Sequence, residues 1–363
     1  MGKPSLILAA LAADALPGLH FVQVQNLTRD DAAVAVELLT TDEGRLILLK
    51  SPLHSLANTD LGTEVRALQV LKNVSLPFGI SSYLGKTSPR AIRNALAFEY
   101  VPGSPAELTR LRLDDGLVSS IGQAISAIHS IPASVVADAG LPEYEPAERV
   151  RTLVAEFDRA MDTGKVHPDL LERWQSALFD VNLFKYRPTV IHGFLKGDFL
   201  LSEGDQVVGV IEWRQLSIDD PAMDLAFIYN ETSEETAEAL VLAYEGTTKA
   251  DRNLRQRAQL HYELTHASFL LEALARGDED EIEEALSAIS WLHERLVAGE
   301  LPSLKPTDFT ATSPEVIVAI SQAASFTAPV TIVTESIEVV DLAEATPAEY
   351  QEPEPKKDED EVF

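Results

Sequence analysis

Apolar and polar residues alternate along residues 21–50, a pattern typical of strands with one buried face. Three strand-like runs, FVQVQNLT, AVAVELLTT and RLILLK, are separated by RDD and by the turn-forming residues DEG at 42–44. Helical apolar spacing follows from Thr59 to Lys72, and then come two more strand-like runs, PFGISSYLGK and ALAFEYV. This pattern predicts a five-stranded antiparallel sheet with one helix inserted after the third strand.

Beyond residue 112 the apolar spacing is mostly helical. One stripe consists of Leu117, Ile121, Ala124, Ile125 and Ile128. Further helices are expected in 145–185 (one or two), 233–246, 251–276 and 279–297, the last two broken at Gly277. TVIHG and QVVGVIEW read as a short strand pair within this helical part. The fold class is therefore α+β, with a strand-rich N-lobe and a mainly helical C-lobe.

The two ends of the chain differ from its middle. MGKPSLILAALAADALPG predicts a helix ending near Pro17 rather than a signal peptide, because one Lys precedes the apolar run and Asp14 follows it. The acidic residues of 335–363 outnumber its two lysines, and we expect a disordered, solubilising tail, with a partner-binding peptide as the alternative. The expected parts are an N-terminal helix and N-lobe (1–100), a helical C-lobe (101–300), a linker with a short docked segment (301–334) and the tail (335–363).

Charge and composition exclude several classes of function. Lys and Arg total 29 against 58 Asp and Glu, a formal net charge of −29 that repels nucleic acid and anionic membranes. No run approaches the roughly 20 apolar residues of a membrane span, and we interpret the protein as cytoplasmic. With no cysteine, disulfides, zinc–thiolate sites and Cys nucleophiles are excluded.

Residues suited to phosphoryl transfer follow one another in a characteristic order. Lys50 ends the third strand-like run, and Glu64 lies in the helix after it. FEYVPG stands where a hinge between two lobes would be, IHGFLKGDFLL stands as a catalytic loop, and VIEW and DDPAMDLA follow. Lysine, helix glutamate, catalytic loop and metal-binding carboxylate occur in this order in kinase-like folds.

The chain from about Leu6 to Val297 resembles the aminoglycoside and macrolide phosphotransferase family, and the macrolide branch is the nearer likeness. The resemblance is carried by EYVPG, IHSIP, RWQSAL, the His-Gly loop, GVIEW and DPAMDLA. It implies a bilobal kinase-like fold that moves the γ-phosphate of ATP or GTP to a hydroxyl of a small molecule, with Mg²⁺.

Two positions of the loop depart from the family pattern. His192, Gly193 and the later Asp224 match it, and we expect them to hold the shape of the loop. The catalytic Asp of the family falls on Phe194, and a metal ligand falls on Phe199. Phenylalanine neither accepts a proton nor ligates Mg²⁺. Weak or absent binding of Mg²⁺ and ATP or GTP is therefore expected.

Five other residues are candidates for roles at this site. Lys50 and Glu64 are candidates for nucleotide binding, paired with each other, and Lys196 is a candidate phosphate contact. The family's metal Asp falls on Glu212, which keeps the charge on a longer side chain, and Asp198 is a possible substitute base or metal ligand. The nucleotide-loop position, NLTRDDA, lacks glycine and places Asp30 and Asp31 near the phosphates.

Two functions therefore remain open from the sequence. One is a catalytically impaired, pseudokinase-like member that acts by binding a protein partner or a small molecule. The alternative is an active Mg²⁺-dependent phosphotransferase with relocated residues. Outside the loop, we expect His129 to pack at a helix end and the Asp219–Asp220 pair to form a turn and a cap before Pro221.

Overall fold

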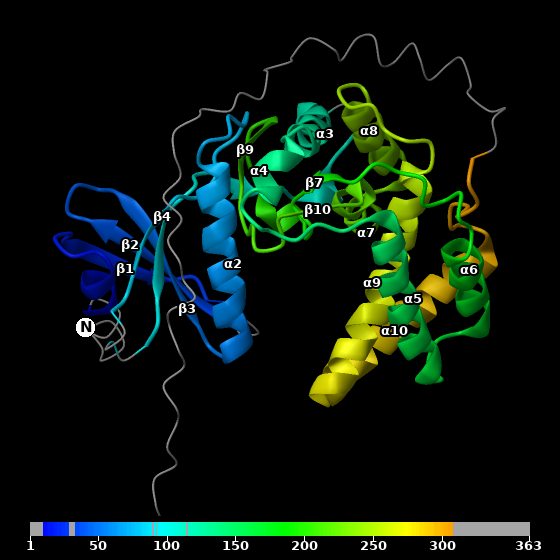
Figure 1. Cartoon of the computed structure of the whole chain (residues 1–363). Coiled ribbons are helices and arrows are strands. Elements are labelled where there is room, and N and C mark those ends of the chain that lie inside the picture. The colour runs from blue at the N-terminus through cyan, green and yellow to red at the C-terminus, as the bar shows by residue number, and fades with distance from the viewer. Residues whose placement is uncertain (1–9, 29–32, 89–90, 92, 114, 308–363) are drawn as a thin grey trace, which may run out of the picture. The chain divides into compact units, whose positions relative to one another are not determined.

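The computed structural model of the protein describes residues 10–28, 33–88, 91, 93–113 and 115–307 (Figure 1). The predictions for Asp30 and Asp31, for a docked segment beyond residue 307 and for the acidic tail lie outside these residues. No helix in the described ranges combines the length and apolar character that crossing a bilayer requires.

The N-terminal sheet has five antiparallel strands in the order β1-β2-β3-β5-β4, which confirms the predicted sheet. Its strands are β1 (Phe21–Asn26), β2 (Val34–Thr41), β3 (Leu46–Pro52), β4 (Tyr83–Lys86) and β5 (Leu96–Glu99). The β2–β3 turn contains Gly44 at φ +81°, and its N–H donates to the Thr41 carbonyl over 2.9 Å. Glycine adopts this backbone conformation without steric cost.

The inserted helix α2 (Ser55–Leu71) lies alongside the sheet in Figure 1 and begins four residues before the predicted Thr59. Its first turn is capped by His54, whose Nδ1 accepts from the Ala57 N–H over 3.2 Å. Histidine is not among the usual N-cap residues, so the sequence pattern gave no signal for this start.

Residues 10–15 form the described part of the predicted N-terminal helix, which ends before Gly18 at φ +93°. Its apolar side chains pack on one face of the sheet. This N-lobe core consists of Leu11, Ala12, Ala15, Leu16, Leu39, Ile47, Leu49, Ala95 and Ala97. The inward-facing apolar residues of the alternating segment 21–50 thus pack against this helix.

Helices make up most of the C-lobe. They are α3 (Gly116–His129), α4 (Ala133–Ala137), α5 (Pro146–Asp162), α6 (Pro168–Leu178), α7 (Ile228–Glu231), α8 (Glu234–Glu245), α9 (Leu254–Arg276) and α10 (Glu279–Ala298). The predicted break at Gly277 is present, since this residue ends α9 in the left-handed conformation at φ +71°. Short 3₁₀ turns lie at η1 (Leu108–Arg110), η2 (Gly197–Phe199) and η3 (Pro221–Leu225).

The C-lobe strands form two small sheets, so the expectation that TVIHG and QVVGVIEW pair with each other is wrong. β7 (Thr189–Ile191) pairs with β10 (Ser217–Asp219). β9 (Gln206–Val210) pairs with β8 (Leu200–Glu203), which also pairs with β6 (Ser104–Pro105). Strands of two to five residues are too short for their alternation to specify a partner.

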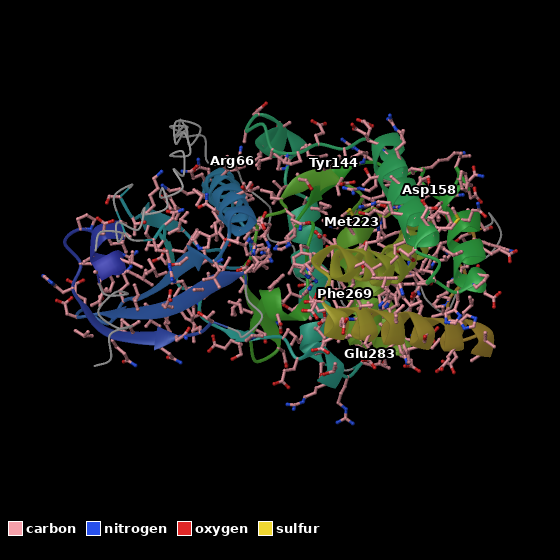
Figure 2. The ribbon with its side chains drawn as sticks, turned by 90° about the horizontal axis from the view of Figure 1, so that it is seen from below. Arg66, Tyr144, Asp158, Met223, Phe269 and Glu283 are labelled. Carbon is pink, nitrogen blue, oxygen red and sulfur yellow. The ribbon has the colours of Figure 1, made fainter. Side chains whose placement is uncertain are left out.

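Side chains fill the space between the C-lobe helices (Figure 2), and Phe269 of α9 packs against their common core. The fully buried members include Trp174, Leu170, Leu183, Leu260 and Leu292. Two backbone hydrogen bonds also join the segment before β4 to β9. The Gly79 N–H donates to the Val208 carbonyl over 2.8 Å, and the Val210 N–H donates to the Gly79 carbonyl over 3.0 Å.

Candidate functional site

Lys50 and Glu64 meet between β3 and α2. In β3, Ile47 and Leu49 point into the N-lobe core. Side chains alternate between the two faces of a strand, so the side chain of Lys50 leaves the sheet on the opposite face. Glu64 lies on the same side of α2 as Leu61 and Leu68, which turns it inward. The Lys50 Nζ donates to both carboxylate oxygens of Glu64, over 2.8 and 2.9 Å.

Glu212, which is half-buried, completes a group of three charges with this pair. It follows β9, and its carboxylate accepts from the Lys50 Nζ over 2.7 Å. Its backbone has φ +69°, and Glu212 is the only non-glycine residue in the described ranges with a left-handed backbone. Such a conformation costs an L-residue about 1–2 kcal/mol. The next residue, Trp213, is fully buried and donates from Nε1 to the Val210 carbonyl, which holds this segment in place.

The charges within this group control one another. Burial alone would lower the pKa of Lys50, but the carboxylates of Glu212 and Glu64 outweigh it and raise that pKa well above its ordinary value. Burial raises the pKa of Glu64. For Glu212 burial acts in the same direction, but Lys50 and Arg214 outweigh it and lower the pKa of this carboxyl. We therefore assign Lys50 as cationic and Glu212 as anionic.

The catalytic-loop position is shaped by Asp224. Its Oδ2 accepts from the His192 N–H over 2.7 Å, and its Oδ1 accepts from the Gly193 N–H over 2.8 Å. Gly193 has φ +83°, and a Cβ there would lie 2.5 Å from the Gln215 carbonyl oxygen. Both the conformation and the space require glycine. These are the three residues expected from the sequence to hold the loop.

His192 joins this loop to the segment that carries Glu212. The ring is fully buried, its Nε2 lies 2.9 Å from the Ile211 carbonyl, and its Nδ1 lies 3.4 Å from the Phe194 N–H. A carbonyl only accepts, so Nε2 carries the proton and Nδ1 accepts. Burial lowers the pKa of His192, in keeping with this neutral form. Both nitrogens are engaged, which favours a structural role over a catalytic one.

His129 does more than pack at a helix end. Its Nε2 lies 3.2 Å from the Asp224 Oδ2, and its Nδ1 lies 2.8 Å from the Tyr244 hydroxyl. Burial alone would raise the pKa of Asp224, but the hydrogen bonds from His129 and from the His192 backbone outweigh it and lower that pKa. The sequence pattern did not reveal this contact, because 95 residues separate His129 from Asp224.

Two aromatic rings lie at the two loop positions for which the sequence predicts a departure from the family pattern. Phe194 and Phe199 are half-buried, and their ring centroids lie 5.8 Å apart. The Lys196 Nζ lies 4.4 Å and the Arg214 Cζ lies 5.3 Å from the Phe194 centroid. Cations at such distances are attracted to the ring. Arg214, which no motif indicated, also lies 3.9 Å from the Glu212 carboxylate.

Lys196 and Asp198 lie on the exposed side of the loop, whereas Leu195 before them and Gly197 between them are buried. The Gly197 N–H donates to Glu231 of α7 over 3.2 Å, which anchors this end of the loop. Burial raises the pKa of Glu231. Lys196 lies over the Phe194 ring, whereas Lys50, Glu64 and Glu212 contact one another.

The donor set is smaller than that of the Mg²⁺ site which the resemblance implies. Mg²⁺ in phosphate-transfer sites is held through one or two carboxylates. Here the single carboxylate at the metal-strand position, Glu212, accepts from Lys50, and Phe199 offers no donor atom. In the part of the chain that the structure describes, no three His, Asp or Glu side chains gather as metal ligands.

The Asp219–Asp220 pair adopts the expected turn and cap, and it also forms buried ion pairs. The Asp220 Oδ1 accepts from the Ala222 N–H over 3.0 Å, which caps η3. Asp220 also accepts from the fully buried Arg257 over 2.8 Å. Burial alone would raise the pKa of Asp220, but Arg257 and His261 outweigh it and hold that pKa far below its usual range.

A Bacillus subtilis (strain 168) protein, YcbJ, described as uncharacterized, is 24% identical over 181 residues, which are 48% of this chain and 58% of that protein. The chain thus matches little more than half the length of this curated relative.

Solved structures show the same fold. Macrolide 2'-phosphotransferase type I has a TM-score of 0.68 and 24% identity, over 80% of this chain and 98% of that one. Macrolide 2'-phosphotransferase MphH from Brachybacterium faecium has a TM-score of 0.66 and 20% identity, over 79% and 97%. The GDP complex of wild-type aminoglycoside 2'-phosphotransferase-IIIa has a TM-score of 0.64 and 18% identity, over 80% and 98%.

These likenesses confirm the predicted kinase-like fold. The family described as APH, the phosphotransferase enzyme family, matches residues 28–261, which is more than half of the chain. That match spans Lys50, the His192–Gly193 loop, Glu212 and Asp224. The chain belongs to the phosphotransferase enzyme family.

Proposed function

We propose that this protein is a catalytically impaired, pseudokinase-like member of the phosphotransferase enzyme family that acts by binding a partner or a small molecule. The observation that carries the proposal is the pair of rings at Phe194 and Phe199, which lie together at the two altered loop positions. A positioned base contributes about 10²- to 10⁴-fold to a transfer reaction. A phenyl ring supplies neither a base nor a metal ligand.

The charges around these rings support the same proposal. Lys50, the candidate for holding phosphates, already donates to two carboxylates. Lys196 and Arg214 lie over the Phe194 ring. A polycationic acceptor such as an aminoglycoside would meet both of these cations at this point of the loop, and the Glu212 carboxylate, 3.9 Å from Arg214, offsets part of their charge.

A second function, an active phosphotransferase with an alcohol group as acceptor, is favoured by the segment around Glu212. The Lys50–Glu64 pair expected for nucleotide binding is formed, and Glu212 is held beside it in a left-handed backbone conformation. Solved structures with this fold include complexes with GDP and ADP. In this alternative, Asp198, Glu212 and Lys196 would take over from the missing residues, with ATP or GTP as donor.

Nucleotide binding and transfer, measured separately, test the proposal. With ATP or GTP at about 1 mM, with and without Mg²⁺, we expect the melting temperature to change by less than about 1 °C. A single-turnover assay with labelled nucleotide and a panel of macrolides and aminoglycosides should transfer no label. Transfer that Glu212→Ala abolishes would establish the second function instead.

A restoration experiment makes the test sharper. The triple variant Phe194→Asp, Phe199→Asn, Glu212→Asp returns the family residues to the loop and the metal strand. The matched control carries Phe194→Asn instead, which has the same shape without a base. If the two rings account for the lost activity, the triple variant gains Mg²⁺-dependent nucleotide binding and transfer, and the control gains binding alone.

A further inference from the structure

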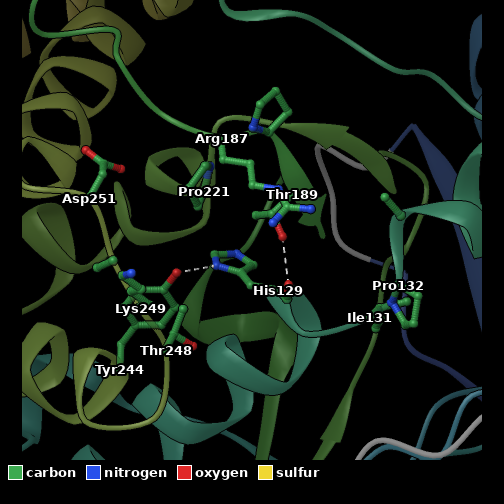
Figure 3. A pocket seen from close by; sticks show the side chains of 13 residues that line it. His129, Ile131, Pro132, Arg187, Thr189, Pro221, Tyr244, Thr248, Lys249 and Asp251 are labelled. Carbon is green, nitrogen blue, oxygen red and sulfur yellow. Dashed lines mark hydrogen bonds between the residues drawn. The ribbon is translucent and has the colours of Figure 1, made fainter.

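A cavity of about 320 Å³ lies where the end of α3, the segment before β7 and the α8–α9 connection meet (Figure 3). The proposed function uses none of its space. Small-molecule sites in proteins begin at about 300 Å³, so a small metabolite fits. Its polar lining comes from His129, Arg187, Thr189, Tyr244, Thr248, Lys249 and Asp251.

The charged side chains in the lining of this cavity are two cations and one carboxylate. Arg187 and Lys249 both line it, and within the described part of the chain neither is joined to a carboxylate. The one carboxylate in the lining, Asp251, is engaged elsewhere, because its two oxygens accept from Arg257 over 2.7 and 2.8 Å. Arg187 and Lys249 are both exposed to solvent, and in a chain with a formal net charge of −29 two cations that line one cavity favour an anion there.

The inner wall of the cavity is rigid and already hydrogen-bonded. His129 and Tyr244 are buried and bonded to each other over 2.8 Å, and Thr189 donates to the His129 carbonyl over 2.7 Å (Figure 3). Pro132, Pro188 and Pro221 also line the cavity. Proline fixes its own φ angle, so a ligand meets walls that are largely pre-formed.

We infer that this cavity binds a small molecule through an oxyanion, either a phosphate or a carboxylate, which Arg187 and Lys249 hold. The guanidinium offers a fork of donors that suits both groups, and the ammonium adds a point charge. A ligand here lies against His129. The Nε2 of His129 contacts Asp224, the residue that shapes the His192–Gly193 turn. The inference does not depend on the proposed function.

Calorimetric titration of the full chain tests this inference, with inorganic phosphate, glycerol 2-phosphate and citrate as probes in a low-salt buffer without other oxyanions. We expect saturable binding of at least one probe, with a Kd below about 1 mM. The double variant Arg187→Ala, Lys249→Ala should weaken it by about tenfold or more, because it removes both charged donors.

The matched control is Lys185→Ala. Lys185 is an exposed cation two residues from Arg187, outside the cavity lining, and it donates to Asn182 over 2.7 Å. It should leave the affinity unchanged. A preference for the phosphate probes or for citrate assigns the group that the site takes. No binding of any probe at about 10 mM, an unchanged affinity in the double variant, or an equal loss in Lys185→Ala would overturn the inference.

Discussion

The ammonium of Lys50 donates to the Glu212 carboxylate over 2.7 Å, although 162 residues separate the two in the chain. This contact joins β3 of the N-terminal sheet to the segment after β9. Glu64 shares the same ammonium from α2. One buried cation therefore holds together three elements that no local pattern connects.

Removing this cation should be costly. Lys50→Met leaves two carboxylates facing each other without a positive charge, and breaking such a buried pair costs about 3–5 kcal/mol. The free energy of unfolding from urea denaturation measures the loss. Arg45→Met provides the control, since Arg45 and Glu99 form a pair in which both side chains are more than two-fifths exposed, 44% and 46%. A control loss as large as that of Lys50→Met would contradict the assignment.

Gly193→Ala should destabilise the loop more than the same change at another left-handed glycine. At Gly193 the new Cβ would meet a carbonyl oxygen at 2.5 Å, whereas at Gly164, with φ +63°, nothing lies within 4 Å. Gly164→Ala then costs only the backbone conformation, about 1–2 kcal/mol, and Gly193→Ala costs clearly more. Thermal unfolding of both variants gives the comparison, and equal losses would refute the steric argument.

Asp224 should make the protein sensitive to acid. Its pKa in the folded protein lies below the ordinary 3.8, so its stabilising contribution is complete above that pH and is lost as the pH falls through the folded value. We expect Asp224→Asn to lose about 2–4 kcal/mol near neutral pH, because two backbone donors and His129 lose a charged acceptor. Its stability should also depend less on pH than that of the wild type below about pH 4. Urea denaturation at several pH values measures the free energy of unfolding of both proteins. The same dependence of that free energy on pH in Asp224→Asn and in the wild type would contradict this role.

Substitutions at Glu212 should separate backbone strain from charge. Asn tolerates the left-handed conformation, whereas β-branched Val does not. Both remove the carboxylate, so the excess destabilisation of Glu212→Val over Glu212→Asn reports the backbone alone, and we expect about 1–2 kcal/mol. Chemical denaturation measures the difference. Equal stabilities would show that the backbone at this position relaxes.

The sequence predicted well those features that repeat or that follow a motif order. The alternation in β1–β3 and the stripe on α3 each extend over several turns or residue pairs, which is enough to specify a buried face. The order from Lys50 through the His-Gly loop to Asp224 predicts which residues frame the loop, and in the structure Asp224 accepts from the His192 and Gly193 backbone. The proposed roles of Lys196, Asp198 and Glu212 stay predictions, because contacts alone do not establish function.

Other features depend on distances that only the folded chain defines. His129 is a single histidine in an apolar helix, and nothing near it in sequence indicates Tyr244 or Asp224 as its partners. Arg214 stands next to the metal-strand motif without belonging to it, yet its guanidinium lies over the Phe194 ring. The pairing of β7 with β10 is set by tertiary packing, since three residues carry too little alternation to choose a partner.

The hydrogen bonds that shape the catalytic-loop position involve only the backbone at Phe194 and Phe199, while the carboxylate that organises them belongs to Asp224. The side chains at these two positions are therefore exempt from the selection that preserves folding through those bonds. The side chains at these two positions can thus differ while the hydrogen bonds that shape the loop stay the same. Substitutions of the Phe194 and Phe199 side chains should therefore leave these backbone hydrogen bonds available to the chain.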